Sequence, residues 1–224
     1  MADEGMSEIL EKFRSAATRY SEVLTKLRRH EIPASYIEFC DSPLSPTQLD
    51  FGSGFLRDTF LELSGYCLVA YDWVRPLAEW IGKRKCLEVM CGCGCLAKAL
   101  RDCGVDIIAT DDFSWENHNA CWFQNPWTEI EQISAVDAVR KYGPQSSLVI
   151  LSWPYMDDSA LNVLKEMRVQ MPGGMMIMIG EWKGATANGD FFREARLVKD
   201  EKFNVAVQNF RQHATIHDFP YLIR

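Results

Sequence analysis

Two short segments contain the residue types that bind a ligand with a ribose. The segment Glu88-Val89-Met90-Cys91-Gly92-Cys93-Gly94 lies between a short apolar stretch and a helical pattern. Glycine lets the backbone approach a ligand closely, and the start of a helix offers free N–H groups. The next apolar stretch ends at Thr110-Asp111-Asp112, where a carboxylate can accept hydrogen bonds from both ribose hydroxyls. Together they predict a ligand site; a plain strand-to-helix junction without ligand is the alternative.

A third segment, Ser152-Trp153-Pro154-Tyr155, ends a later apolar stretch and combines a hydroxyl with two aromatic rings, which makes it a candidate for contact with a substrate. A strand-end turn with a buried aromatic cluster is the alternative. Glu181 and Trp182 end a later apolar stretch and are candidate substrate contacts, although a solvated loop glutamate is an equally good interpretation.

These segments must be positioned by strands that alternate with helices. Continuous apolar runs predict buried strands, and apolar residues at helical spacing predict helices between them. The expected strands are 86–90, 105–110, 129–134, 147–152, 175–179, 203–209 and 214–223, and the expected helices are 96–103, 134–142, 158–169 and 190–199. This order predicts a doubly wound α/β fold whose ligands bind beyond the carboxyl ends of the strands.

The first part of the chain follows a different pattern. An amphipathic helix is expected over 7–30, a loop rich in Gly, Pro and Ser over 40–54, and helices over 55–71 and 73–82. We therefore predict an N-terminal helical extension over 1–82 and a ligand-binding domain over 83–224. The 40–54 loop is a candidate lid.

The first two segments resemble those of the class I S-adenosylmethionine (SAM) dependent methyltransferases. The family's first motif is an acidic residue, one residue, then Gly-x-Gly-x-Gly; here Glu88 is the acid, Met90 stands where the first glycine usually sits, and Gly92 and Gly94 follow. The resemblance covers residues 84–223. It implies a Rossmann-like, mostly parallel sheet of seven strands, with one antiparallel strand near the C-terminus, and SAM as cofactor.

The resemblance also implies roles for individual residues. The backbone of Gly92–Gly94, next to Cys91, would cradle the methionine part of SAM. Asp111, with Asp112 beside it, would bind the ribose hydroxyls. Asp137-Ala138 resembles the pair near the adenine, where Asp137 would accept from the adenine amino group.

Ser152-Trp153-Pro154-Tyr155 resembles the amino-methyltransferase motif (Asp, Asn or Ser)-Pro-Pro-(Tyr, Phe or Trp), with Trp153 in place of the first proline. By resemblance, Ser152 and the Trp153 carbonyl would accept from the amine and Tyr155 would stack on it. The implied activity is N-methylation of a planar amine, a nucleobase or a protein side chain.

Two other functions remain open. Met90 and Trp153 depart from the family pattern and motivate a methyltransferase-like binding or regulatory module without catalysis. A dinucleotide-binding enzyme is also compatible with Gly92, Gly94 and Ala97, although the 152–155 segment then has no role.

The net charge and the apolar runs of the sequence bear on its binding partners and its location in the cell. A net charge of −7 disfavours nonspecific binding to nucleic acid, so a small-molecule or protein methyl acceptor is favoured. No apolar run reaches the roughly 18 residues of a membrane span, and the start of the chain lacks a signal peptide pattern, which predicts a cytoplasmic or nuclear protein.

The eight cysteines are expected to be free thiols in a reducing compartment. Cys91, Cys93 and Cys95 lack the spacing and the second pair of a zinc site, so no metal is predicted. A redox-sensitive thiol is a further hypothesis, because a helix N-terminus lowers thiol pKa.

Overall fold

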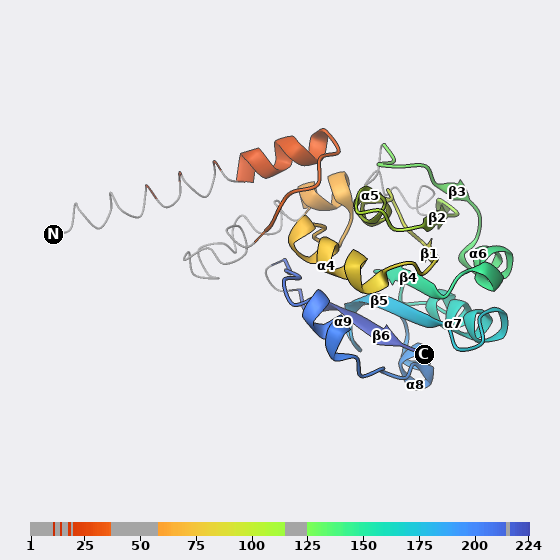
Figure 1. Ribbon diagram of the computed structural model, residues 1–224. Coiled ribbons are helices and arrows are strands. Elements are labelled where there is room, and N and C mark those ends of the chain that lie inside the picture. The colour runs from red at the N-terminus through yellow and green to blue at the C-terminus, as the bar shows by residue number, and fades with distance from the viewer. Residues whose placement is uncertain are drawn as a thin grey trace.

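The sheet sets the architecture (Figure 1). The computed structural model describes residues 11, 14, 18, 20–36, 58–114, 125–213 and 216–224. Within them a six-stranded sheet has the order β3-β2-β1-β4-β5-β6, parallel except for β6, which runs antiparallel to β5. The strands are β1 Cys86–Val89, β2 Ile107–Asp111, β3 Glu131–Gln132, β4 Leu148–Ser152, β5 Met175–Glu181 and β6 Asp218–Ile223. This confirms the predicted mostly parallel α/β fold.

Helices cover both faces of the sheet, as Figure 1 shows. Two helical segments, 20–28 and 58–64, precede the α/β unit. The later helices are α4 Tyr71–Ile81, α5 Cys95–Asp102, α6 Ala135–Tyr142, α7 Ser159–Gln170, α8 Gly189–Glu194 and α9 Glu201–Ala206, with a 3₁₀ turn η2 at Gly143–Gln145. Helices α4, α5 and α9 pack on one face, and α6, α7 and α8 on the other. In the described ranges, no helix is both long and apolar enough to cross a membrane.

Alternate residues of the central strands enter two separate cores. In β4, Leu148 and Ile150 join the cluster under α4 and α5, whereas Val149 and Leu151 join the cluster under α6 and α7. Residues 176–179 of β5 alternate in the same way. Side chains of a strand point to opposite faces in turn, so a strand covered on both sides must be apolar throughout. Each fully buried aliphatic side chain contributes roughly 1.5–3 kcal/mol.

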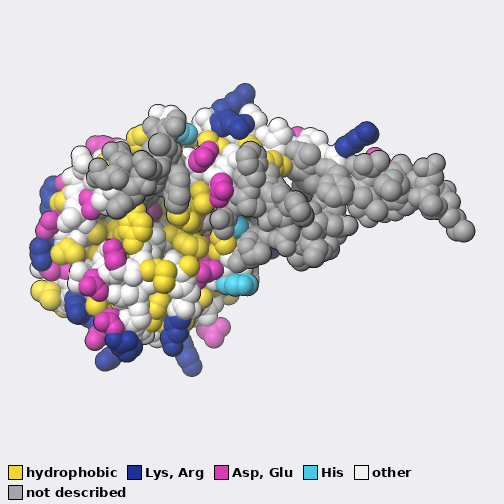
Figure 2. Space-filling view, turned by 180° about the vertical axis from the view of Figure 1, so that it is seen from behind, with side chains coloured by type: hydrophobic (Ala, Val, Ile, Leu, Met, Phe, Trp, Pro, Cys, Tyr) yellow, Lys and Arg dark blue, Asp and Glu magenta, His cyan; other side chains and the backbone are white. Residues whose placement is uncertain are grey.

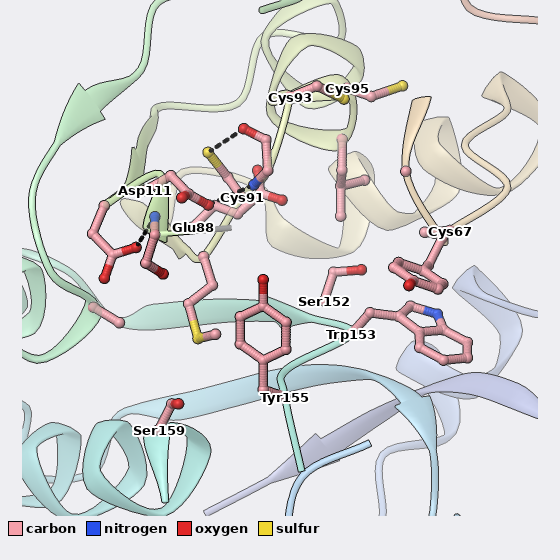
Figure 3. A pocket seen from close by; sticks show the side chains of 18 of the residues that line it. Cys67, Glu88, Cys91, Cys93, Cys95, Asp111, Ser152, Trp153, Tyr155 and Ser159 are labelled. Atoms are coloured by element: carbon pink, nitrogen blue, oxygen red, sulfur yellow. Dashed lines mark hydrogen bonds between the residues drawn. The ribbon is translucent and has the colours of Figure 1, made fainter. Parts of the chain in front are cut away.

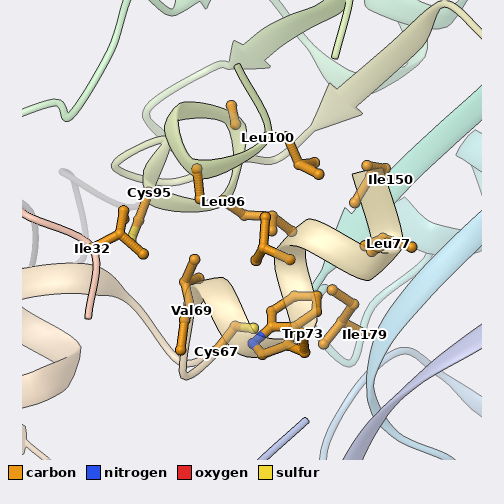
Figure 4. Packing of buried hydrophobic residues seen from close by; sticks show 14 of the residues in the cluster. Ile32, Cys67, Val69, Trp73, Leu77, Cys95, Leu96, Leu100, Ile150 and Ile179 are labelled. Atoms are coloured by element: carbon orange, nitrogen blue, oxygen red, sulfur yellow. The ribbon is translucent and has the colours of Figure 1, made fainter. Parts of the chain in front are cut away.

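The described N-terminal residues pack into the first of these cores. Leu27, Phe60 and Trp73 are fully buried and belong to the cluster that contains Ile150 and Ile179. Figure 4 shows Val69 on the side of Cys95 and Leu96 of α5, and Trp73 next to Cys67 and Ile179. The division at residue 82 stays a prediction, and the candidate lid at 40–54 lies outside the described residues.

Three secondary-structure predictions need correction. The strand expected over 203–209 is helix α9: Asp200 caps it by accepting from the Phe203 amide, and Phe203 and Ala206 are buried on one face. The seventh strand is therefore not shown. The helix expected over 55–71 ends at residue 64 in the described part of the chain, because Gly65 at φ 89° breaks it; residues 55–57 lie outside the described residues. The helix expected over 190–199 stops at Glu194, and Leu197 bridges to Ile223.

Candidate functional site

A cavity of about 520 Å³ opens at the carboxyl ends of β1, β2 and β4 (Figure 3). This volume is within the range of small-molecule sites, and the location is where open α/β sheets bind ligands. Figure 3 places Glu88, Cys91 and Asp111 on one side and Ser152, Trp153 and Tyr155 on the other. The walls are formed by Ser64, Gly65, Tyr66, Cys67, Val69, Glu88, Met90, Cys91, Gly92, Cys93, Cys95, Leu96, Asp111, Asp112, Ser114, Ser134, Ala135, Val136, Ser152, Trp153, Tyr155, Asp157 and Ser159.

The turn after β1 has a left-handed backbone. Gly92 and Gly94 have φ of 56° and 75°, and a Cβ on Gly94 would lie 3.0 Å from side-chain atoms of Ile130 and Thr128. The left-handed backbone favours glycine at 94, and a larger residue would also have to displace the Ile130 and Thr128 side chains. Gly94 is the N-cap of α5 and offers no side chain to the first N–H groups of the helix; the Cys95 amide donates to the Cys93 sulfur and the Ala97 amide donates to the Glu88 carboxyl instead.

Asp111 connects this turn to the end of β2. Its carboxylate accepts hydrogen bonds from the Gly92 amide at 2.8 Å and from the Phe113 amide at 2.7 Å. Asp112 accepts from the Ser114 amide at 2.9 Å and is exposed at the cavity edge. Both acidic residues predicted to bind a ribose thus lie at the cavity, next to the glycine turn.

Glu88 is a buried acid facing this cavity. Only 1% of its surface is exposed, and its Oε2 has no hydrogen-bond partner. Burial raises the pKa of Glu88 to about 8; the charge of Arg101 opposes this shift and Asp111 adds to it. A buried carboxyl with an unpartnered oxygen is costly for stability, and such groups concentrate at functional sites.

The cysteines of the turn are not activated thiols. Cys93 and Cys95 are buried beneath the start of α5, and burial raises the pKa of both, that of Cys93 to about 12. Burial outweighs the helix N-terminus, so the hypothesis of a low-pKa, redox-sensitive thiol is wrong for these two residues. Among the described residues, no group of three or more His, Cys, Asp and Glu could hold a metal ion.

Trp153 is held in a left-handed backbone conformation after β4. Its φ is 52°, and its amide donates to the Ile179 carbonyl at 2.8 Å. The indole ring stacks on Tyr66 with 4.8 Å between ring centroids, and its Nε1 donates to Asp218 at 3.0 Å. Ser152, Trp153 and Tyr155 all line the cavity. The backbone of Pro154 accepts from the Ala187 amide instead.

The resemblance to the amino-methyltransferase motif does not extend to the backbone at residue 153. Proline fixes φ near −65° and has no N–H, so it fits neither the φ of Trp153 nor its bond to Ile179. The tryptophan is thus part of a different local conformation. The role of its carbonyl as an acceptor for an amine stays a prediction.

The predicted adenine pair is not brought to the cavity. Asp137 is exposed; it accepts from Ser134 Oγ at 2.7 Å and pairs with Arg140 at 3.0 Å, and Ala138 is buried in the second core. The residues just before them, Ser134, Ala135 and Val136, line the cavity in their place.

The predicted substrate contacts after β5 also lie elsewhere. Glu181 accepts from the amides of Ala185 and His217 at 3.0 and 2.9 Å, which fixes the loop after β5. Trp182 packs against Phe192 and Tyr221. Neither residue lines the cavity.

The sequence analysis missed several lining residues, among them Tyr66 and Asp157. Tyr66 lies in the connection from the 58–64 helix to α4, and its contact with Trp153 depends on the path of that connection. Asp157 precedes α7 and accepts from the Ser159 amide at 2.9 Å. The sequence did carry a signal for the position of Asp157. An acid just before a helical pattern marks a helix start, and this start follows the strand that ends at Ser152.

Replacing Met90 with glycine, the residue usual at this position of the methyltransferase motif, is expected to be tolerated. Met90 has φ of 54° and lines the cavity, and left-handed backbone costs a residue with a Cβ roughly 1–2 kcal/mol. We expect Met90→Gly to be about 1 kcal/mol more stable than Met90→Ala, which also lacks the long side chain but keeps the Cβ. Chemical denaturation of both variants measures this difference. Greater stability of the alanine variant would contradict the left-handed backbone.

No family model matches the chain, and no curated protein matches it either. Among solved structures, it is similar to TehB from Haemophilus influenzae, with 14% identity, covering 75% of this chain and 66% of that chain at a TM-score of 0.43. It is similar to the mitomycin 7-O-methyltransferase MmcR, with 14% identity, covering 93% of this chain and 68% of that chain at a TM-score of 0.44. It is also similar to human N-acetylserotonin methyltransferase in complex with SAM, with 14% identity, covering 93% of this chain and 67% of that chain at a TM-score of 0.39. Values this low assign neither an activity nor a ligand to this chain.

Proposed function

We propose that this protein is a SAM-dependent methyltransferase that methylates a nitrogen of a planar amine. The observation that supports this most is the cavity at the carboxyl ends of β1, β2 and β4. There the Gly92 amide of the glycine turn donates a hydrogen bond to Asp111, and Glu88 Oε2 has no hydrogen-bond partner. A sulfonium cofactor with an amino group offers a positive charge to buried carboxyls.

The cavity has residues that suit three parts of SAM. Asp111 and Asp112 would hold the ribose hydroxyls, and Ser134, Ala135 and Val136 would flank the adenine. The backbone of Gly92–Gly94, whose glycines have left-handed φ, would cradle the methionine part. When bound, SAM supplies a methyl group on a positively charged sulfur, and transfer to a nitrogen lone pair leaves a neutral thioether.

The other side of the cavity would receive the acceptor. Ser152 Oγ would accept from an amine N–H and so direct the lone pair, and the Tyr155 ring would stack on the acceptor. Five residues before α4 form one wall of the cavity: Ser64, Gly65, Tyr66, Cys67 and Val69. Such positioning supplies most of the rate enhancement in a transfer that needs no strong base.

A binding or regulatory module without catalysis is the second candidate. The observation that favours it is the φ of 52° at Trp153, which differs from the backbone that a proline would give. A module of this kind would bind SAM and transfer nothing.

Ser152→Ala tests the catalytic proposal. We expect roughly 100-fold slower methyl transfer from labelled SAM to an active aromatic amine, because a misdirected nitrogen loses the in-line geometry, with SAM affinity unchanged. The control is Ser146→Ala, whose hydroxyl donates to the Tyr142 carbonyl away from the cavity. Unchanged turnover in Ser152→Ala would contradict the assigned role. SAM binding without transfer to any member of an amine panel would favour the module.

A further inference from the structure

The acceptor side of the cavity is aromatic and acidic. Tyr66 and Trp153 are stacked there. Tyr155 lines the same cavity, apart from the Trp153 ring, with 48% of its surface exposed (Figure 3). Aromatic faces carry partial negative charge and attract cations.

The cavity's charges have one sign. Asp111, Asp112 and Asp157 line it, together with Glu88, which stays mostly protonated at neutral pH because burial raises its pKa to about 8; none of the described lining residues is Lys, Arg or His. On the face shown in Figure 2, Lys and Arg side chains lie mainly at the periphery, around a hydrophobic and acidic centre.

The carboxylates that line the cavity act electrostatically on its aromatic residue Tyr155. Tyr155, Asp111, Asp112 and Asp157 line the same cavity, and burial raises the pKa of Tyr155 while the three carboxylates raise it further. The unpartnered Oε2 of Glu88, 1% exposed, is an independent sign that the cavity receives a ligand with a hydrogen-bond donor or a positive charge.

We propose that the acceptor enters this cavity as an ammonium ion that carries an aromatic ring, as 2-phenylethylammonium does. Acceptors that carry a phosphate or carboxylate are rejected. This inference rests on the proposed function and specifies its substrate class. An anionic acceptor would have to approach the carboxylates without a counter-charge among the described lining residues.

The chemistry balances with water as the proton acceptor. The ammonium loses one proton to water, which reaches the cavity beside the exposed Tyr155. The freed nitrogen lone pair then forms the C–N bond as the S–C bond breaks, and its electron pair stays on sulfur. The methylated nitrogen carries the positive charge until it loses a second proton to water.

Three probes share a phenyl ring and differ in the charge of the end group: 2-phenylethylamine, 2-phenylethanol and 3-phenylpropanoate. They separate the effect of ligand charge on binding from the effect of ring stacking. We expect calorimetric titration of the full chain, saturated with demethylated SAM, to give about tenfold tighter binding of the amine than of the carboxylate, with the alcohol between them. Added salt should narrow the difference, because Asp112 and Asp157 are exposed.

Variants locate the effect. Asp157→Asn is expected to reduce the amine-to-carboxylate preference about threefold, and Tyr66→Leu to weaken all three probes. Asp106→Asn removes the same charge from an exposed position before β2, at the opposite end of that strand, and should change nothing.

Each outcome decides one question. Equal or tighter binding of the carboxylate, or binding of none of the three probes, would overturn the inference. SAM is titrated into the same preparations: its failure to bind would overturn the proposed function instead, whereas normal SAM binding with a reversed probe order would overturn only the substrate class.

Discussion

Replacing Glu88 with glutamine is expected to stabilise the protein at high pH. The pKa of Glu88 is about 8 in the folded protein against 4.5 for an ordinary glutamate. The folded state therefore holds a proton that the unfolded state releases, and the free energy of unfolding falls as pH rises through this window. Glutamine cannot ionise, so Glu88→Gln avoids this loss.

The difference between variant and wild type should grow by roughly 4 kcal/mol from about pH 5 to about pH 9, since one pKa unit corresponds to about 1.4 kcal/mol. Urea denaturation at a series of pH values measures it. Asp218→Asn is the matched comparison: burial raises the pKa of Asp218 to about 6 from 3.8, so its difference should be complete by about pH 7. A constant difference for Glu88→Gln across the range would show that this carboxyl is not buried.

Replacing Trp153 with the family's proline is expected to destabilise the protein strongly. The left-handed φ of 52° lies far from the φ of proline, and the substitution also removes the amide that donates to Ile179. These backbone effects cost roughly 3 kcal/mol or more. Trp153→Gly loses the same indole contacts with Tyr66 and Asp218 but tolerates the backbone, so it isolates the effect.

Thermal or urea unfolding of the two variants gives the result directly. We expect Trp153→Pro to be the less stable by about 3 kcal/mol. Equal stability of the proline and glycine variants would mean that residue 153 can adopt the backbone of the family's motif, and would strengthen the resemblance to the amino-methyltransferases.

The sequence predicted the site best where one local signal decided the structure. Gly92 and Gly94 needed left-handed backbone, and Asp111 had to end the neighbouring parallel strand, so their meeting followed from strand order. Alternating burial in β4 and β5 likewise followed from continuous apolar runs.

The errors had a different origin. Ser134 and Asp137 have the spacing of a helix N-cap and its third residue, and this local bond keeps Asp137 out of the cavity. Phe203 and Ala206 are spaced by three, which fits a helix better than a strand. The Tyr66–Trp153 contact joins residues far apart in the chain, and no local pattern encodes such a pairing.

Calorimetric titration of the full chain with SAM tests the central claim most directly, with the demethylated product and NAD titrated alongside. We expect micromolar binding of SAM and its product, no binding of NAD, and a loss of SAM affinity in Asp111→Ala, whose carboxylate bonds the Gly92 amide. Absence of SAM binding, or tighter binding of NAD, would contradict the account and leave the cavity to another ligand.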